Sequence, residues 1–233
     1  SGDMILGALM DAGLPLDKLK NELAKLELDH YDLQVEKVAK RGLGGSQAKV
    51  LIDDHHHHDH HRHLHHIEEI IGQSNLSDPV KTKSLAIFRR LAEAEAKVHR
   101  TTIDAIHFHE VGAMDAIIDV VGSVAGLSAL GIEKVYCSPM HVGTGTVECA
   151  HGTLPVPAPA TAELVRNKPI FSTDVEGELL TPTGAAILTT LADDFCPMPA
   201  MILEKVGYGA GRSDPSIPNL LRISIGEAAE EVK

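Results

Sequence analysis

The feature that most constrains the fold is a run of histidines in the interior of the chain. From residue 55 to residue 66 the sequence reads HHHHDHHRHLHH, so nine of twelve positions are histidine. No packing requirement explains this run, and segments with helical periodicity follow it. We therefore expect residues 54–66 to form a loop that is disordered without metal. Its histidines are His55, His56, His57, His58, His60, His61, His63, His65 and His66.

The histidine run predicts a metal-binding tract. Neutral imidazole is well suited to nickel, zinc and copper, and clustered imidazoles can satisfy several coordination geometries. The alternative is a purification tag, but tags are normally terminal and uniform, whereas this run is internal and interrupted by Asp59, Arg62 and Leu64. Because catalysis needs ligands held by a supporting shell, we expect the tract to concentrate metal for an ordered site elsewhere.

Hydrophobic periodicity indicates both helices and strands. Predicted helices cover residues 4–11, 16–26, 64–71, 79–98, 113–130, 160–166 and 184–191. Predicted strands cover residues 31–38, 47–52, 135–137, 170–175 and 220–225. The segment 143–159 is crowded with Gly, Thr and Pro, so we expect little regular structure there. The mixture indicates an α/β (α+β mixed) fold, with a sheet packed against helices and the histidine loop inserted.

The domain organisation follows from the position of the histidine loop. We expect an N-terminal α/β portion over residues 1–53, the loop over 54–66, a main α/β portion over 67–226 and an acidic tail over 227–233. The length of 233 residues allows one large domain or two small ones.

Composition argues against several classes of partner. The formal net charge is −12, and Lys and Arg form no stripe, so nucleic acid is not expected as a partner. No apolar run approaches the roughly 18 residues that span a bilayer, and the first residues do not resemble a signal peptide. We therefore expect a soluble, cytoplasmic protein. The three cysteines have no CxxC spacing and are expected to be reduced.

An ordered metal or polar-substrate site is predicted between residues 107 and 119. On a strand, His107 and His109 would share a face about 7 Å apart, within reach of one metal if they converge. Asp115 and Asp119 are one turn apart on the following helix. We predict His107, His109 and Asp119 as metal ligands, and His107, His109, Glu110 and Asp115 as catalytic residues. The alternative is that the histidines are structural and the acids a solvated helix face.

Three further segments could bind an anion. Thr181-Pro182-Thr183-Gly184 can begin a helix whose free backbone N–H groups suit a phosphate. Glycines in Gly143-Thr144-Gly145-Thr146 and in Gly207-Tyr208-Gly209-Ala210-Gly211 permit backbone nests, and Arg212 could add a charge. Ordinary turns are the alternative for each. The predicted cofactor-binding residues are Gly143, Thr144, Gly145, Thr146, Thr181, Thr183, Gly184, Gly209 and Gly211.

Several strings together resemble the LarC family. They are SGDM at residues 1–4, HFHEVGAMDAIIDVVG at 107–122, HGTLPVPAPAT at 151–161, TPTGAA at 181–186 and GYGAG at 207–211. The resemblance implies CTP-dependent nickel insertion into pyridinium-3,5-bisthiocarboxylic acid mononucleotide, which forms the nickel-pincer cofactor of lactate racemase. Such a protein would be a lyase-class nickel insertase, or cyclometallase.

Two departures from the family pattern affect what this chain would do alone. Family members usually begin with an apolar strand before the SGDM turn, and they continue into a C-terminal region that resembles the CTP-binding part. The resemblance therefore implies that this chain corresponds to the N-terminal region of the family. Its ligands would be nickel and the mononucleotide, and its partner would be a C-terminal CTP-binding domain. CTP, with Mg or Mn, would bind that domain, and the fragment alone could be inactive. Homo-oligomerisation is left open.

Two other functions are compatible with the residues. In the first, the chain is a nickel store or metallochaperone that acts through the histidine tract alone. In the second, it is a metal-dependent hydrolase of small phosphate esters, which is less favoured because no recognised nucleophile or paired-metal motif is present.

Overall fold

The computed structural model of the chain describes residues 1–52, 63–106, 108, 114–149 and 151–229. Most of the predicted histidine tract, including His55, His56, His57, His58, His60 and His61, lies outside these residues. The same holds for the predicted site residues His107, His109 and Glu110.

The predicted helices are confirmed, with small changes at their ends. They are α1 (Gly2–Asp11), α2 (Leu16–Ala24), α3 (Leu64–Gln73), α4 (Asp78–Val98), α5 (Met114–Ala129), α6 (Pro159–Leu164) and α7 (Pro182–Leu191), with a 3-10 turn at Ile103–Ala105. Prolines in the first turn of α4, α6 and α7 favour their starts, because proline lacks the N–H that a first turn leaves unpaired. The last residues of the histidine run, His65 and His66, belong to α3 and not to a loop.

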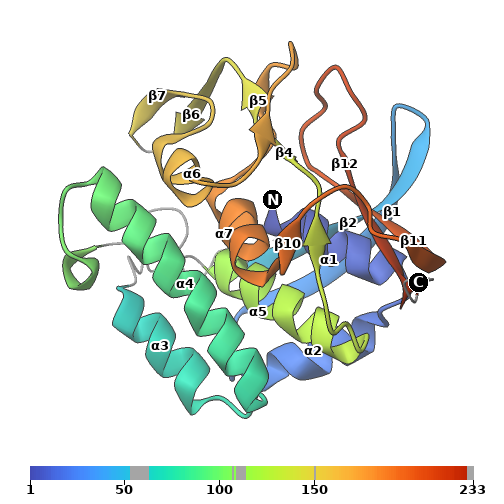
Figure 1. The fold of residues 1–233 in the computed structure, drawn as a ribbon. Helices are drawn as coiled ribbons and strands as arrows, with labels where there is room; N and C mark the ends of the chain where they lie inside the picture. Colours follow the sequence, from blue (N-terminus) through green and yellow to red (C-terminus); the bar gives the residue numbers. More distant parts are fainter. Residues whose placement is uncertain (53–62, 107, 109–113, 150, 230–233) are drawn as a thin grey trace.

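A four-stranded sheet forms one side of the molecule (Figure 1). Its strands are β1 (Tyr31–Lys40), β2 (Leu43–Ile52), β11 (Met201–Ala210) and β12 (Leu220–Ala228), in the order β1-β2-β11-β12. The β1–β2 and β11–β12 pairs are antiparallel, and β2 meets β11 in parallel at Ser46 and Gly209. The sequence did not predict β11, and it left Gly42, Gly44 and Gly45 between the strands predicted over 31–38 and 47–52, whereas Gly44 and Gly45 belong to β2. The actual turn consists of Arg41 and Gly42, which both have positive φ.

Short strand pairs lie between residues 136 and 195. The pairs are β3 (Tyr136–Cys137) with β10 (Asp194–Phe195), β4 (Met140–His141) with β8 (Ile170–Phe171), β5 (Gly143–Thr144) with β9 (Gly177–Glu178), and β6 (Thr146–Cys149) with β7 (Gly152–Pro155). Three of their strands, β5, β6 and β7, occupy the segment 143–159, so the expectation of little regular structure there was wrong. β3 lies within the strand predicted over 135–137. Glycines with positive φ allow the chain to turn sharply between these pairs. The strand predicted over 170–175 is limited to its first two residues.

The hydrophobic core lies between the sheet and the helices. α1 packs on β2 and β11 with one face and on α5 with another, so Leu6 and Leu9 are completely buried. Phe88 of α4, Ile117 of α5 and Ile187 of α7 belong to the same buried cluster. This cluster therefore joins residues from before and after the histidine tract, while the division into domains stays a prediction. No helix within the described ranges is long and apolar enough to span a membrane.

Candidate functional site at the start of helix α1

The N-termini of α1 and α7 meet beside the second turn of α5. A Cβ atom added to Gly2, in the first turn of α1, would lie only 2.6 Å from Cβ of Asp119, which belongs to the second turn of α5. One added to Gly184, in the first turn of α7, would lie 3.2 Å from the Ser1 nitrogen. Figure 1 shows the N-terminus beside α7. Helix N-termini carry unpaired N–H groups and partial positive charge, so their meeting point is suited to polar groups.

The first turn of α1 positions a buried carboxylate. Asp3 is 7% exposed and accepts a hydrogen bond from the Met4 backbone N–H over 2.8 Å. The Ser1 hydroxyl donates a second hydrogen bond to the same oxygen, Oδ1. The other oxygen, Oδ2, pairs with Nε of Arg212 at 3.2 Å. Asp3 therefore joins the start of α1 to the residue that follows the GYGAG segment.

Asp119 contributes a second carboxyl group, and it is deeply buried. Its Oδ1 is inaccessible to solvent and has no hydrogen-bond partner among the described residues. Burial raises the pKa of this carboxyl well above its ordinary value, and the nearby charges of Asp3 and Asp115 raise the pKa further. Arg212 opposes this increase. We call Asp3, Asp115, Asp119 and Arg212 the α1 cluster. A buried acid without a partner is typical of a site that a ligand completes.

Helix α7 begins as the sequence predicts. Thr181 is the N-cap, its hydroxyl accepts a hydrogen bond from the Gly184 N–H over 3.2 Å, and Pro182 is the first helical residue. Thr183 is half-buried and Gly184 is buried. The helix start that was predicted to bind a phosphate is therefore present and lies against Ser1. The binding role of Thr181, Thr183 and Gly184 stays a prediction.

The Gly143–Thr146 segment is divided between two strand pairs. Gly143 and Thr144 form β5, while Thr146 begins β6. Gly143 and Gly145 have φ values of +87° and +84°. Gly143 lies opposite Glu178, which is within electrostatic reach of the Ser1 terminus. The predicted binding role of the residues in this segment is untested.

The GYGAG segment does not form a backbone nest, so this structural expectation was wrong. Gly207 and Gly209 belong to β11, and neither has positive φ. A Cβ at Gly207 would lie 2.2 Å from the Ala8 carbonyl oxygen, and one at Gly209 would lie 1.8 Å from that of Met4. Glycine is required here because the strand touches the helix backbone. Gly211 is likewise close to Asn219. Binding by Gly209 and Gly211 remains a prediction.

The described end of the histidine tract contacts the residue that precedes the predicted ligand His107. The rings of His63, His65 and His66 lie near one another, with centroids 3.9–5.7 Å apart. Nδ1 of His63 is 3.1 Å from the carbonyl oxygen of Ile106, the residue before His107. Within the described ranges, no three or more His, Cys, Asp or Glu side chains form a group that could hold a metal ion.

The structure thus joins Asp115 and Asp119, as predicted, and adds two residues that were not among the predicted site residues. Sequence reasoning missed Asp3, and it mentioned Arg212 only as a charge near a glycine segment. The available signal was the SGDM string, in which Gly2 contacts α5 and Asp3 accepts a hydrogen bond from the Met4 N–H. Only the fold brings residues 3, 119 and 212 together.

The chain belongs to the nickel insertion protein family, which it matches over residues 1–233. It is 58% identical over 233 residues to the pyridinium-3,5-bisthiocarboxylic acid mononucleotide nickel insertion protein of Desulfitobacterium hafniense. A protein of the same name from Acetivibrio thermocellus is 48% identical over 241 residues. Both alignments cover 100% of this chain but only 57% and 59% of the relatives. No solved structure matches the chain.

Proposed function

We propose that this chain carries the site at which nickel is inserted into pyridinium-3,5-bisthiocarboxylic acid mononucleotide, giving the nickel-pincer cofactor of lactate racemase. Membership of the nickel insertion protein family supports the metal, and the names of the relatives support the substrate. The observation that carries the proposal is the buried carboxyl of Asp119, whose Oδ1 has no partner among the described residues and which lies against the first turn of α1. We expect the reaction to take place in the cytoplasm.

Nickel is a substrate in the proposed reaction, and no change of oxidation state is needed. A C–H bond of the pyridinium ring breaks, and its electron pair forms the nickel–carbon bond. The proton passes to a carboxylate, for which Asp115 and Glu110 are the candidates. The two thiocarboxylate sulfurs replace water molecules on Ni²⁺. His107, His109 and Asp119 are the proposed ligands that hold nickel before transfer.

CTP, with Mg²⁺ or Mn²⁺, is the proposed co-substrate in the intact protein, meaning these 233 residues with whatever sequence flanks them. Among the described residues, no group of three or more His, Cys, Asp or Glu side chains could hold the metal ion. We therefore propose that CTP binds the C-terminal domain implied by the family resemblance. No step within this chain is assigned to CTP.

The contact between His63 and Ile106 supports a supply role for the histidine tract. It places the end of the tract one residue from the proposed ligand His107 along the chain. Nickel gathered on the tract would then have a short path to the ordered site. This arrangement favours a reservoir that serves insertion over a store that acts alone.

The test of the proposed function is nickel insertion by the intact protein, followed by mass spectrometry of the nickel-containing product. Asp115→Asn and Glu110→Gln each remove a candidate base. Loss of the responsible base is expected to slow insertion by about 100-fold or more, since general bases contribute roughly 10²–10⁴-fold. Glu133→Gln, at an exposed position shortly after α5, is the matched control. Unchanged insertion in both variants would remove these residues from the mechanism.

The nine-histidine run specifically favours a second candidate function, the nickel store or metallochaperone. Replacing His55–His58, His60 and His61 with Asn separates the two functions. His63 and Leu64 are kept, because His63 contacts Ile106 and Leu64 is buried in the core. Insertion at saturating nickel is expected to persist in this variant, while nickel stoichiometry by calorimetry falls. Loss of all nickel binding together with loss of insertion would support the store.

A further inference from the structure

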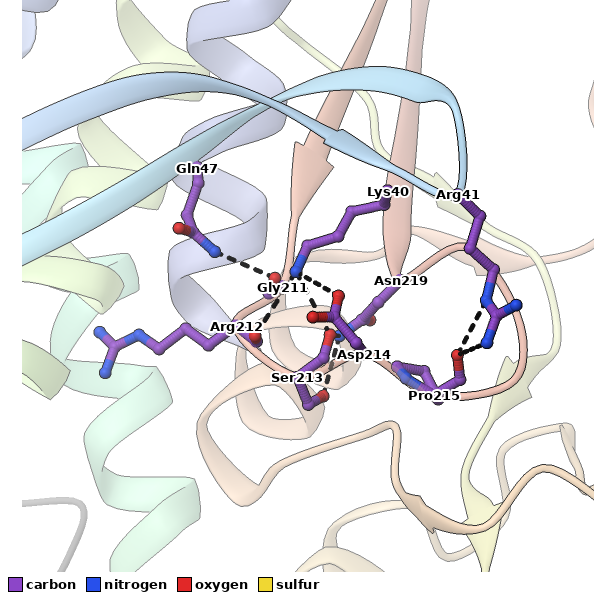
Figure 2. Close-up of polar contacts among 9 residues, drawn as sticks. All are labelled: Lys40, Arg41, Gln47, Gly211, Arg212, Ser213, Asp214, Pro215 and Asn219. Atoms are coloured by element: carbon purple, nitrogen blue, oxygen red, sulfur yellow. Dashed lines mark hydrogen bonds and ion pairs between the residues drawn. The ribbon is translucent and has the colours of Figure 1, made fainter.

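The loop between β11 and β12 is fixed by side chains from the β1–β2 hairpin (Figure 2). Gln47 donates a hydrogen bond to the Gly211 carbonyl oxygen over 3.0 Å. Lys40 Nζ contacts the carbonyl oxygens of Arg212 and Ser213 at 3.4 and 3.5 Å. Arg41 donates two hydrogen bonds to the Pro215 carbonyl oxygen, over 3.1 and 2.9 Å. Four backbone carbonyls of residues 211–215 therefore accept side-chain hydrogen bonds from one hairpin.

Two of the residues that fix this loop, Lys40 and Gln47, are unusually buried for their types. Gln47 is 8% exposed, and the Lys40 side chain is 10% exposed while it pairs with Asp214 at 2.7 Å. Asn219 donates to Ser213 from the other side. Surface loops normally bond to water, and ordering a lysine costs side-chain entropy. The fold thus holds this backbone in one place although the loop itself is largely exposed.

Arg212 is the residue that this fixed backbone presents to the α1 cluster. Figure 2 shows its side chain extending away from the contacts within the loop. Its Nε pairs with the buried Asp3 at 3.2 Å, and its side chain remains 59% exposed. A guanidinium has five N–H donors on more than one edge, so Asp3 can hold one edge while another binds an oxyanion. In the described part of the chain, Arg212 is the cationic side chain that pairs with an acid of this cluster.

We propose that Arg212 binds the phosphate monoester of the mononucleotide substrate, and that Lys40 and Gln47 are the positioning residues that hold it there. The inference rests on the proposed function, because it assigns the phosphate-binding residue of that same site. The buried, unpartnered Oδ1 of Asp119 beside the helix starts marks the place that a ligand completes.

The charge of the surroundings explains why an arginine is needed. The carboxylates of Asp3 and Asp115 would repel a dianionic phosphate, and the chain as a whole has a formal charge of −12. A planar, permanently charged guanidinium can pair with two phosphate oxygens at once, whereas a lysine acts as a point charge. Fixing the backbone of Arg212 reduces the entropy lost when the phosphate binds.

The test measures binding of two ligands to the intact protein by calorimetry: the pyridinium mononucleotide and the same nucleoside without its phosphate. Arg212→Met is expected to lower the affinity for the mononucleotide about 10- to 100-fold, as for loss of hydrogen bonds to a charged group. The affinity for the nucleoside is expected to stay unchanged. Arg222→Met is the matched control, because Arg222 is exposed on β12, opposite Tyr208. Its affinity for both ligands should match that of the unaltered protein.

Three outcomes are distinguishable. Equal weakening of both ligands by Arg212→Met, or no weakening of either, would overturn the role in phosphate binding. A mononucleotide that lacks one thiocarboxylate serves as a third ligand. If Arg212→Met weakens binding of the nucleoside but not of this third ligand, Arg212 binds the carboxyl end and the phosphate assignment is wrong. If the unaltered protein binds neither ligand, the proposed function itself fails.

The positioning role of Lys40 has its own test. Lys40→Met is expected to lower the preference for mononucleotide over nucleoside about 3- to 10-fold, while Lys49→Met is expected to leave it unchanged. Lys49 lies on the same hairpin and pairs with Glu36, away from the loop. A purely structural Lys40 would lower the melting temperature without changing the preference, and that result would overturn the positioning role.

Discussion

Two glycine-rich segments of this protein look alike in sequence and use glycine for opposite reasons. In Gly143–Thr146 the glycines have positive φ, and an added Cβ at Gly145 would meet nothing within 4 Å. In Gly207–Gly211 the glycines have ordinary strand geometry, and an added Cβ at Gly209 would enter the backbone of α1. Gly145 is needed for its conformation alone and Gly209 for space alone, while Gly143 is needed for both, because its added Cβ would lie 2.0 Å from the Gly177 carbonyl oxygen.

The difference shows why a glycine-rich string is weak evidence for a phosphate loop. A nest requires backbone N–H groups that point to a common centre, and a strand directs them to its neighbours. β11 pairs with β12 along nearly its whole length. The contribution of the second segment to the site is therefore indirect: it packs on α1 and delivers Arg212 to the start of that helix.

The largest expected effect tests the packing glycine. In Gly209→Ala the new Cβ would lie 1.8 Å from the Met4 carbonyl oxygen, so strand and helix must separate. We expect a loss of about 4 kcal/mol or more in the free energy of unfolding, as for severe core overpacking. Urea denaturation followed by circular dichroism measures it. A loss below about 1 kcal/mol would show that β11 does not press on α1.

The next effect concerns Asp119 of the α1 cluster and not the packing of β11 on α1. The pKa of Asp119 is raised in the folded protein, so the folded state keeps this proton to higher pH than the unfolded state, whose value is about 3.9. Wild-type stability is therefore lost as pH rises above that value. Asp119→Asn does not titrate and should be more stable by on the order of 1–3 kcal/mol at neutral pH, because each pH unit between the unfolded and the folded pKa costs the unaltered protein roughly 1.4 kcal/mol.

Thermal unfolding from pH 4 to pH 8 measures this difference between Asp119→Asn and the unaltered protein. The advantage should grow with pH and vanish near pH 4. A constant difference at every pH would show that the carboxyl is not the titrating group. Asp104→Asn, in the 3-10 turn, serves as a control because Asp104 is exposed.

A smaller loss is expected at the conformational glycine. Gly145→Ala meets no atom but forces alanine to φ near +84°. This should cost about 1–2 kcal/mol, the usual penalty for a left-handed residue with a Cβ. The same denaturation assay compares it directly with Gly209→Ala. If Gly145→Ala and Gly209→Ala lowered the free energy of unfolding equally, the distinction between a glycine needed for conformation and one needed for space would be wrong.

The smallest effect is a gain. Gly44 lies in β2 opposite Ala39, is exposed, has no positive φ, and has nothing within 4 Å of an added Cβ. Gly44→Ala should stabilise the protein by about 0.5–1 kcal/mol, because alanine loses less backbone entropy in a strand. A measured loss would reveal a constraint on β2 that neither conformation nor space explains.

Local patterns in the sequence were sufficient to predict much of the secondary structure. Proline at the first turn and apolar residues at helical spacing predicted α4 and α7 closely, since these signals act within one turn. The sequence failed at β11, where glycines lower strand propensity but permit contact with α1. It also failed over 143–159, where residues far along the chain, such as Gly177, supply strand partners.

The candidate site divides in the same way. Asp115 and Asp119 could be recognised together because they are one helical turn apart. The Thr181 cap could be recognised because its hydrogen bond with the Gly184 N–H joins residues three positions apart. Asp3 and Arg212 are separated by 209 positions in the numbering, and only the packing of β11 on α1 places them 3.2 Å apart. Local hydrogen bonds and periodicity are encoded by neighbouring residues, so the sequence by itself determined the helices and the motifs on which the family resemblance rests. Burial of Asp119 and the Asp3–Arg212 pair depend on which surfaces meet, so only the tertiary structure decided them.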